Sequence, residues 1–221
     1  MTGWPAPSPH RTLAGRTRKV YDRMSAVYPV STMLFHSRAH RAALSASGIR
    51  DGMNVLEVAT GSGEMFRKLV RVNGNGSTVG VDLSPNMASR TQRHAQRKYP
   101  SARAHCQAVD ARRMPFKDAA FDAVVCCYLL ELLSPEDMVS TVHEFRRVLR
   151  KHGNLTLVLI GQQIPIFNAC YRIAGRIAPA FWGRQVARNA PEIVKSAPFE
   201  IIQDMQLRQG YYPSRVLVAR K

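Results

Sequence analysis

Residues 55–63 read VLEVATGSG, an apolar run that ends in a turn of small residues. The pattern predicts a buried strand, a sharp turn and a helix that begins near Glu64. The glycines at 61 and 63 lack a Cβ, so a ligand can approach the backbone there and reach the amides at the helix N-terminus. Asp82 ends the next predicted strand, 19 residues after Gly63, which is the spacing at which a βαβ unit places a carboxylate beside a ribose. The stretch therefore predicts a site for a nucleoside-containing cofactor.

The glycine turn differs from the two common nucleotide-binding motifs. A dinucleotide site needs GxGxxG, but the third glycine is missing here, and the sequence contains no GxxxxGK[ST] motif for ATP. Glu57 lies inside the predicted strand, where a buried acid needs a partner. The combination of Glu57, the GxG turn and Asp82 resembles motif I of the class I S-adenosylmethionine-dependent methyltransferases. The resemblance extends over about residues 16–160.

The resemblance implies that S-adenosylmethionine is the cofactor, and it implies which residues surround it. In that family the glycine turn passes under the methionine part, the acid matching Asp82 binds both ribose hydroxyls, and the acid matching Asp110 accepts from the adenine amino group. An ordinary loop acid is the alternative interpretation of Asp110. Tyr21 belongs to a segment that resembles the lid helix of this group and would close over the methionine carboxylate; a plain amphipathic helix is the alternative. The implied cofactor-binding residues are Tyr21, Glu57, Ala59, Thr60, Gly61, Ser62, Gly63, Asp82, Leu83, Met87, Asp110, Ala111 and Cys127.

The acceptor side of the site is predicted to follow the fourth strand. Residues 121–133 and 144–153 resemble the fourth-strand and subsequent helix motifs of small-molecule methyltransferases related to ubiquinone and menaquinone biosynthesis. In this group the reacting methyl points to the position of Tyr128, which either lines the acceptor site or simply packs. Glu131 stands where many relatives carry a histidine; it is a candidate general base or ligand of a substrate cation, or else a solvated acid that caps a helix. Tyr28 would lie over the cofactor as part of the lid, so the catalytic candidates are Tyr128, Glu131 and Tyr28.

Strands and helices alternate along the chain. This order predicts an α/β fold with a doubly wound, seven-stranded, mostly parallel sheet, N-terminal lid helices and a C-terminal antiparallel hairpin. Pro29 is expected to break the N-terminal helical pattern, and Gly153 is expected to separate a helix from the strand after it. The expected strands are 53–59, 77–82, 103–109, 121–127, 154–160 and two within 199–219, and the expected helices are one from residue 16 up to the proline, then 32–46, 64–72, 84–98, 135–150 and 166–178.

The length of 221 residues suits one domain with a full core. Residues 1–15 are rich in Pro, Ser and Gly and are expected to be a disordered tail. The remainder, 16–221, is expected to be a single methyltransferase domain. Its expected parts are lid helices at 16–47, a cofactor-binding core at 51–160, a substrate-side insertion at 161–197 and a closing hairpin at 198–221.

The net charge of +17 is unevenly distributed, with +7 in residues 1–50, +4 in 51–162 and +6 in 163–221. Basic flanks suit an anionic membrane surface or nucleic acid, and an arginine-rich but merely soluble surface is the alternative. The four cysteines lack metal-ligand spacing, which favours a reducing cytoplasm. His36 and His40 are four residues apart but have no further ligand nearby, so no metal is expected. No signal peptide or membrane span is expected, and the predicted location is the cytoplasm, with peripheral attachment to the inner membrane face as an option.

These features favour a methyltransferase that acts on a small or lipid-like acceptor. The preferred acceptor is a phospholipid amine of the phosphatidylethanolamine type, because soluble bacterial phospholipid N-methyltransferases share this layout and the basic flanks contain apolar residues. A quinone is the alternative, although the quinone enzymes carry an Arg-Asn pair where Cys127 and Tyr128 stand. The charge also suggests an RNA methyltransferase, but no RNA-recognition motif is present, so a nucleic acid partner is not expected. A non-catalytic, cofactor-binding scaffold is the alternative outside enzymes, and the oligomeric state stays open.

Overall fold

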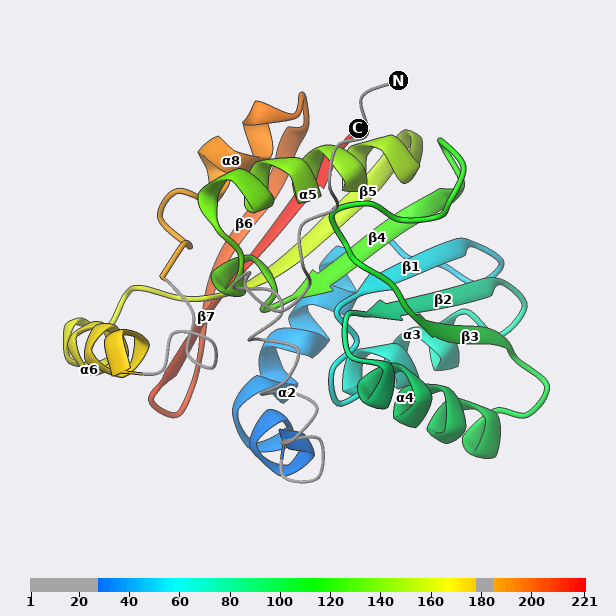
Figure 1. Cartoon of the computed structure of the whole chain (residues 1–221), viewed down its shortest axis with the longest axis horizontal. Coiled ribbons are helices and arrows are strands. Elements are labelled where there is room, and N and C mark those ends of the chain that lie inside the picture. The colour runs from blue at the N-terminus through cyan, green and yellow to red at the C-terminus, as the bar shows by residue number, and fades with distance from the viewer. Residues whose placement is uncertain (1–27, 178–184) are drawn as a thin grey trace, which may run out of the picture.

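The computed structural model describes residues 28–177 and 185–221, with 28–35 and 175–177 as backbone only, and shows one sheet between layers of helices (Figure 1). Seven strands follow the order β3-β2-β1-β4-β5-β7-β6. β7 pairs antiparallel with β5 and β6, whereas all the other neighbouring strands are parallel. The predicted fold class and the closing hairpin are therefore confirmed. The strands are β1 (Asn54–Val58), β2 (Ser77–Asp82), β3 (Arg103–Ala108), β4 (Phe121–Cys127), β5 (Leu149–Ile160), β6 (Glu200–Gln209) and β7 (Tyr212–Arg220).

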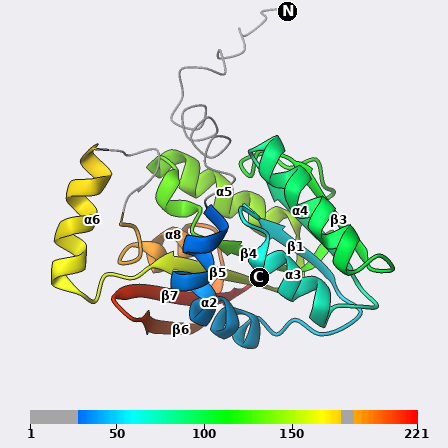
Figure 2. The same cartoon turned by 90° about the horizontal axis from the view of Figure 1, so that it is seen from below.

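Helices cover both faces of the sheet. α2, α3 and α4 lie on one face, and α5 and α8 lie on the other, so the sheet is covered on both sides (Figures 1 and 2). α6 stands away from the sheet beside the end of the β6–β7 hairpin (Figure 2). The helices are α2 (Tyr28–Ala46), α3 (Glu64–Val72), α4 (Pro85–Lys98), the short 3₁₀ helix η1 (Leu130–Leu132), α5 (Pro135–Val148), α6 (Pro165–Ile177) and α8 (Ala190–Ser196).

Burial on both faces explains why the central strands read as continuous apolar runs. On β7, Val216 and Val218 pack into the cluster beneath α2 and α3, while Leu217 and Ala219 pack into the cluster beneath α5 and α8. Each of these four residues is 0% exposed. β7 therefore lies inside the sheet, and β6, at the edge, keeps a mixed pattern of half-buried and exposed residues.

Two helices that carry site residues begin with the same local device. Ser84 and Ser134 are N-caps, and their hydroxyls accept hydrogen bonds from the amides of Met87 at 3.2 Å and Asp137 at 3.1 Å. A proline follows each cap at the first helical position, where its missing N–H needs no partner. The predicted starts of α4 and α5 are thereby confirmed. α4 begins directly after β2, and α5 begins shortly after η1.

Two predicted boundaries were wrong. The second helix was expected from about Thr32, but α2 (Tyr28–Ala46) already includes Pro29. Gly153 does not separate α5 from the next strand, because β5 begins at Leu149, directly after the helix, and runs through the glycine. The register between β4 and β5 shifts between Phe121 and Ala123, so the glycine lies in an irregular part of the pairing.

Within the described residues, the rest of the sequence-based assignment agrees with the structure to within a residue or two, except for η1 and α8, which were not predicted. The helix predicted from residue 16 up to the proline lies outside these residues. The segment 161–197 was predicted to hold one helix, but the part that the structure describes contains both α6 and α8. The predicted tail of 1–15 and the lid residue Tyr21 lie outside the described residues. Across the described ranges, none of the helices is long and apolar enough to span a membrane.

Candidate active site

The glycine turn between β1 and α3 is built from left-handed residues. Ala59, Gly61 and Gly63 have φ values of 61°, 48° and 73°. A Cβ on Gly63 would approach Thr91 Oγ1 of α4 to 2.7 Å, so this glycine also permits the close packing of α3 against α4. The amide of Thr60 still bonds to Val81 of β2 at 3.2 Å. The turn therefore bends sharply while remaining tied to the sheet, as a ligand-cradling turn requires.

Asp82 links the end of β2 to this turn. One carboxylate oxygen accepts a hydrogen bond from the amide of Gly61 at 2.7 Å, and the other accepts from the amide of Ser84 at 2.9 Å. The residue is only 9% exposed, and its carboxylate faces the cavity at the carboxyl ends of the strands. The structure thus brings together the glycine turn and the acid that their sequence spacing predicted to be neighbours.

Two cavities meet at the turn. The larger one runs from the glycine turn past the end of β2 to the segment after β3, and it collects seven of the predicted cofactor residues: Ala59, Gly61, Asp82, Leu83, Asp110, Ala111 and Cys127. The smaller one lies under α2 and is lined by His36, His40, Glu57, Ala59, Thr60, Gly61, Ser62, Met65, Cys127 and Tyr128. Gly63 and Met87 line neither cavity; Gly63 lies against Thr91 of α4, and Met87 is buried within α4.

Glu57 is the buried acid that needed a partner. It is 1% exposed, and its Oε2 has no hydrogen-bond partner among the described residues. Burial and the nearby charge of Asp82 raise the pKa of Glu57 well above its ordinary value. A buried carboxyl group with one unpaired oxygen beside a glycine turn suits a ligand that carries an ammonium group, and Asp82 suits one that carries a ribose. The residues present therefore fit S-adenosylmethionine, whose amino-acid end and nucleoside end have these two groups.

Asp110 has a partner that the sequence reasoning missed. The Arg112 side chain donates three hydrogen bonds to this carboxylate, from Nε at 3.0 Å and 3.1 Å and from Nη2 at 2.6 Å, and its Nη1 reaches Asp137 of α5 at 3.2 Å. Burial raises the pKa of Asp110, but the hydrogen bonds and charge of Arg112 outweigh this effect and hold it below its usual range. The predicted contact between Asp110 and an adenine amino group stays a prediction. It requires Asp110 to accept hydrogen bonds from Arg112 and from the adenine at the same time, which a carboxylate with two oxygens can do.

Tyr128 lies where the two cavities meet. It has a φ of 55°, which is uncommon for a residue with a large side chain, and its hydroxyl lies 2.9 Å from Ser214 Oγ of β7. The ring of His36 stacks on it at a centroid distance of 4.2 Å and also lies 4.9 Å from Tyr212. Phe167 of α6 contacts Tyr212 at 5.5 Å. We call these four residues, His36, Tyr128, Phe167 and Tyr212, the aromatic wall.

The sequence singled out only Tyr128 as a member of the aromatic wall. His36 was considered only as a metal ligand, and among the described residues no group of three His, Cys, Asp or Glu side chains is arranged to hold a metal. His40, its neighbour on α2, has its Nδ1 3.5 Å from Glu64 Oε2. Burial and the proximity of His40 lower the pKa of His36 to about 3, so the imidazole is neutral at physiological pH. The backbone of Tyr28 begins α2, and its predicted catalytic role stays a prediction.

Glu131 is buried rather than solvated. The expectation of a solvated, helix-capping acid was wrong, because the residue is 1% exposed and lies in η1. Its Oε1 accepts a hydrogen bond from the amide of Ile160 at 2.7 Å, which ties η1 to the end of β5. Glu131 is absent from the lining of both cavities described above, so its contacts support a positioning role, and direct catalysis by this residue stays a prediction.

Replacing Glu131 by glutamine is expected to change how stability depends on pH. Burial raises the pKa of Glu131 from 4.5 to about 7, so the folded protein binds an extra proton between these values and loses stability as the pH rises through them. The loss of unfolding free energy is absent below pH 4.5 and complete above about pH 7, and it amounts to about 3 kcal/mol. Glu131→Gln keeps an acceptor for Ile160 and cannot ionise, so its unfolding free energy relative to wild type should rise from about pH 5 to about pH 7.5.

Urea unfolding at the two pH values measures this difference. Glu192→Gln, which neutralises an exposed acid on α8, is the matched control and should show no such change. If Glu131→Gln and the control have the same pH dependence as wild type, the buried carboxyl group does not titrate in this range.

Comparison with known proteins agrees with this geometry. Residues 55–153 match the methyltransferase domain family. The chain is 27% identical over 151 residues to the 2-phytyl-1,4-naphtoquinone methyltransferase of Trichormus variabilis, a match that covers 66% of this chain and 65% of that protein. It is 27% identical over 213 residues to the ubiquinone/menaquinone biosynthesis C-methyltransferase UbiE of Laribacter hongkongensis, covering 90% of this chain and 84% of the relative.

Solved structures share the fold at lower identity. The N-methyltransferase NodS from Bradyrhizobium japonicum, in complex with S-adenosyl-L-homocysteine, superposes with a TM-score of 0.75 at 18% identity, covering 93% of this chain and 98% of that one. The [4+2]-cyclase SpnF superposes with a TM-score of 0.77 at 17% identity, covering 100% and 99%. These likenesses establish the fold alone, since a cyclase shares it. Residues 55–153 match the methyltransferase domain family, and with the glycine turn and Asp82 they make this part of the chain similar to the class I S-adenosylmethionine-dependent methyltransferases.

Proposed function

We propose that this methyltransferase transfers the methyl group of S-adenosylmethionine to a small, apolar, ring-bearing acceptor of the quinone type. The observation that carries the proposal is the aromatic wall: its Tyr128 lines both cavities, its His36 lines the smaller one, and Tyr212 and Phe167 continue the ring contacts from there. Flat aromatic side chains suit a flat ring, because offset stacking adds attraction to the burial of apolar area. The relatives from Trichormus variabilis and Laribacter hongkongensis are named for naphthoquinone and ubiquinone or menaquinone chemistry, which supports the same acceptor class.

The cofactor supplies an electrophilic methyl group on a cationic sulfur, so the protein has mainly to hold and orient the two reactants. Asp82 would hold the ribose, and Glu57 would face the ammonium group of the methionine part. The ring face of Tyr128, fixed by Ser214 and by the stacked His36, can stabilise a nearby cation. A neutral His36 adds no positive charge beside that sulfur and can still exchange a hydrogen bond with a carbonyl or hydroxyl group of the acceptor.

A phospholipid amine of the phosphatidylethanolamine type is the second candidate acceptor. The specific observation in its favour is again the set of ring faces, because Tyr128, Tyr212 and Phe167 can bind an ammonium group through cation–π attraction. The absence of the Arg-Asn pair at Cys127 and Tyr128 also fits this candidate better than a quinone. The two acceptors are separated by their chemistry: one has a flat apolar ring, and the other a primary amine.

Removing the ring of Tyr128 is expected to impair methyl transfer more than removing its hydroxyl. Tyr128→Phe loses the contact with Ser214 and keeps the stacking on His36, whereas Tyr128→Leu loses both. The aromatic contacts of a ring are worth up to about 1.5 kcal/mol beyond burial, so kcat/KM should fall by up to about tenfold in the leucine variant and less in the phenylalanine variant. Radioactive methyl transfer from labelled cofactor to a reduced demethylated naphthoquinone measures both.

The same assay, repeated with phosphatidylethanolamine vesicles and with total RNA, tests the proposal against its alternatives. Methylation of the lipid amine without the quinol would replace the first candidate by the second. Methylation of RNA alone would contradict both. Cofactor binding by calorimetry without transfer to any of the three acceptors would favour the non-catalytic scaffold.

A further inference from the structure

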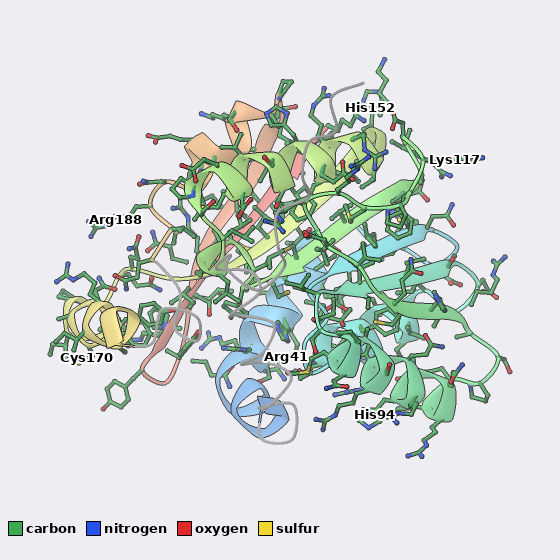
Figure 3. All side chains as sticks on the ribbon, in the orientation of Figure 1. Arg41, His94, Lys117, His152, Cys170 and Arg188 are labelled. Carbon is green, nitrogen blue, oxygen red and sulfur yellow. The ribbon has the colours of Figure 1, made fainter. Side chains whose placement is uncertain are left out.

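α6 carries apolar side chains on the side that faces away from the molecule. Ile166 is 79% exposed and Ile173 is 59% exposed, and Cys170 between them is exposed as well. Spacings of four and seven residues place these three side chains on one face of the helix. Figure 3 shows Cys170 on α6 at the outer edge of the molecule, away from the sheet.

The opposite side of α6 belongs to the active-site side of the molecule. Tyr171 is 4% exposed, and Phe167 stacks on it at 5.7 Å and reaches Tyr212 of the aromatic wall at 5.5 Å. The start of this region is tied to β6 by a hydrogen bond from Gln163 Nε2 to the carbonyl of Leu207 at 2.9 Å. α6 is therefore a thin cover: its inner residue Phe167 forms part of the aromatic wall, and its outer residues Ile166 and Ile173 are exposed.

The turn between β6 and β7 extends this exposed surface. Tyr211, at the tip of the turn, is 91% exposed, and α6 and the turn lie side by side in both views (Figures 1 and 2). Arg208 is exposed just before the turn, and its carbonyl accepts a hydrogen bond from Nη1 of the exposed Arg38 of α2 at 3.1 Å. Arg172 is exposed on α6. We call the set Arg38, Ile166, Arg172, Ile173, Arg208 and Tyr211 the α6 surface.

The segments that form the α6 surface carry only positive formal charges. The sequence contains no Asp or Glu in α2, in α6 or from residue 205 to the C-terminus. Asp204, the acid nearest in sequence to the turn, is paired with Arg215. Exposed apolar side chains among unopposed arginines match a partner with a negative surface over an apolar interior.

We propose that the α6 surface docks on the surface of an anionic phospholipid bilayer, with Ile166, Ile173 and Tyr211 inserted among the lipids and the three arginines at the phosphate level. Docking in this orientation places the cover formed by α6 between the bilayer and the aromatic wall. That placement would bring an apolar acceptor to the site directly from the bilayer, a consequence that rests on the proposed function; docking itself does not depend on the acceptor.

Sedimentation of the full chain with vesicles tests the proposal. The vesicles contain phosphatidylcholine alone or phosphatidylcholine with phosphatidylglycerol. The wild-type protein should sediment with the anionic vesicles only, and added salt should weaken the binding. Replacing Arg172 and Arg208 by glutamine should weaken it by about fivefold for each arginine, since each contributes attraction near an anionic surface. Replacing Ile166, Ile173 and Tyr211 by serine should reduce binding at least as much while leaving the salt dependence in place.

A matched control separates the α6 surface from net charge. Arg93→Gln with Arg97→Gln removes the same charge from exposed positions on α4 and should leave vesicle binding unchanged. Cofactor affinity and the thermal unfolding midpoint of each variant show whether its fold is intact. Equal binding to neutral vesicles, no binding to either kind, or equal losses in the α4 control and the α6 variants would overturn the proposal.

The same variants also distinguish two other partners of the α6 surface, a second copy of the chain and RNA. A dimer in analytical ultracentrifugation that dissociates when Ile166, Ile173 and Tyr211 are replaced would mean that the α6 surface binds a second copy of the chain. Salt-sensitive binding of RNA that is lost in the Arg172 and Arg208 variant, without vesicle binding, would mean that it binds nucleic acid. Either result overturns the membrane assignment, and neither one bears on whether the protein transfers methyl groups to a quinol.

Discussion

Replacing Asp82 by alanine is expected to weaken binding of S-adenosylmethionine at least tenfold. Hydrogen bonds to a charged group contribute roughly 1.5–3 kcal/mol each, and the carboxylate would accept two from the ribose hydroxyls. The same carboxylate already holds the amides of Gly61 and Ser84, so its loss also frees the glycine turn that the cofactor needs. Isothermal titration calorimetry with S-adenosylmethionine and with S-adenosylhomocysteine measures the loss, and both ligands should be affected alike because they share the ribose.

Two variants show that the effect belongs to the site. Asp82→Asn keeps one acceptor oxygen and loses the charge, so its affinity should fall between those of wild type and alanine. Asp51→Ala removes another acid that accepts hydrogen bonds from loop groups, among them the amide of Asn75 at 2.7 Å, but this acid lines neither cavity. Its cofactor affinity should be unchanged. Unchanged affinity in a folded Asp82→Ala protein would show that the ribose is held elsewhere.

Replacing Gly61 by valine is expected to abolish measurable cofactor binding. Gly61 lines both cavities, so the branched side chain would enter the space where the two meet. The structure adds a second effect that was not expected from the sequence. Gly61 has a φ of 48°, a left-handed conformation that costs an L-residue roughly 1–2 kcal/mol, so the variant should also unfold more readily. Calorimetry measures the first effect and denaturant unfolding the second.

Gly52→Val is the matched control for backbone strain. Gly52 has a φ of 88°, no atom lies within 4 Å of an added Cβ, and the residue lines neither cavity. This variant should lose similar stability and keep full cofactor affinity. Normal cofactor binding by Gly61→Val would mean that the turn has been assigned to the wrong part of the cofactor.

The adenine end shows the limit of reasoning from spacing. Asp110 was predicted from its place after the third strand, and it does line the larger cavity. Arg112 was not predicted, although it is only two residues further on, because a sequence does not reveal that this side chain would turn back and bridge Asp110 to Asp137, 25 residues away. Glu131 illustrates the opposite error: its interpretation as a solvated acid was wrong, because packing buried it against the end of β5, while its role in catalysis stays a prediction.

The sequence by itself determined the sheet, the glycine turn and the position of Asp82. These features depend on local backbone geometry: an apolar strand, glycines with a left-handed φ and one helical crossover bring residues 61 and 82 together without help from the rest of the chain. The aromatic wall and the α6 surface were decided only by the tertiary structure. Tyr128 meets Ser214 across 86 residues, and Ser37 meets Gln209 across 172, because α2 packs over β5, β7 and β6 after β7 has inserted antiparallel into the sheet. Contacts over such separations depend on how whole elements pack, and no local pattern in the sequence encodes that arrangement.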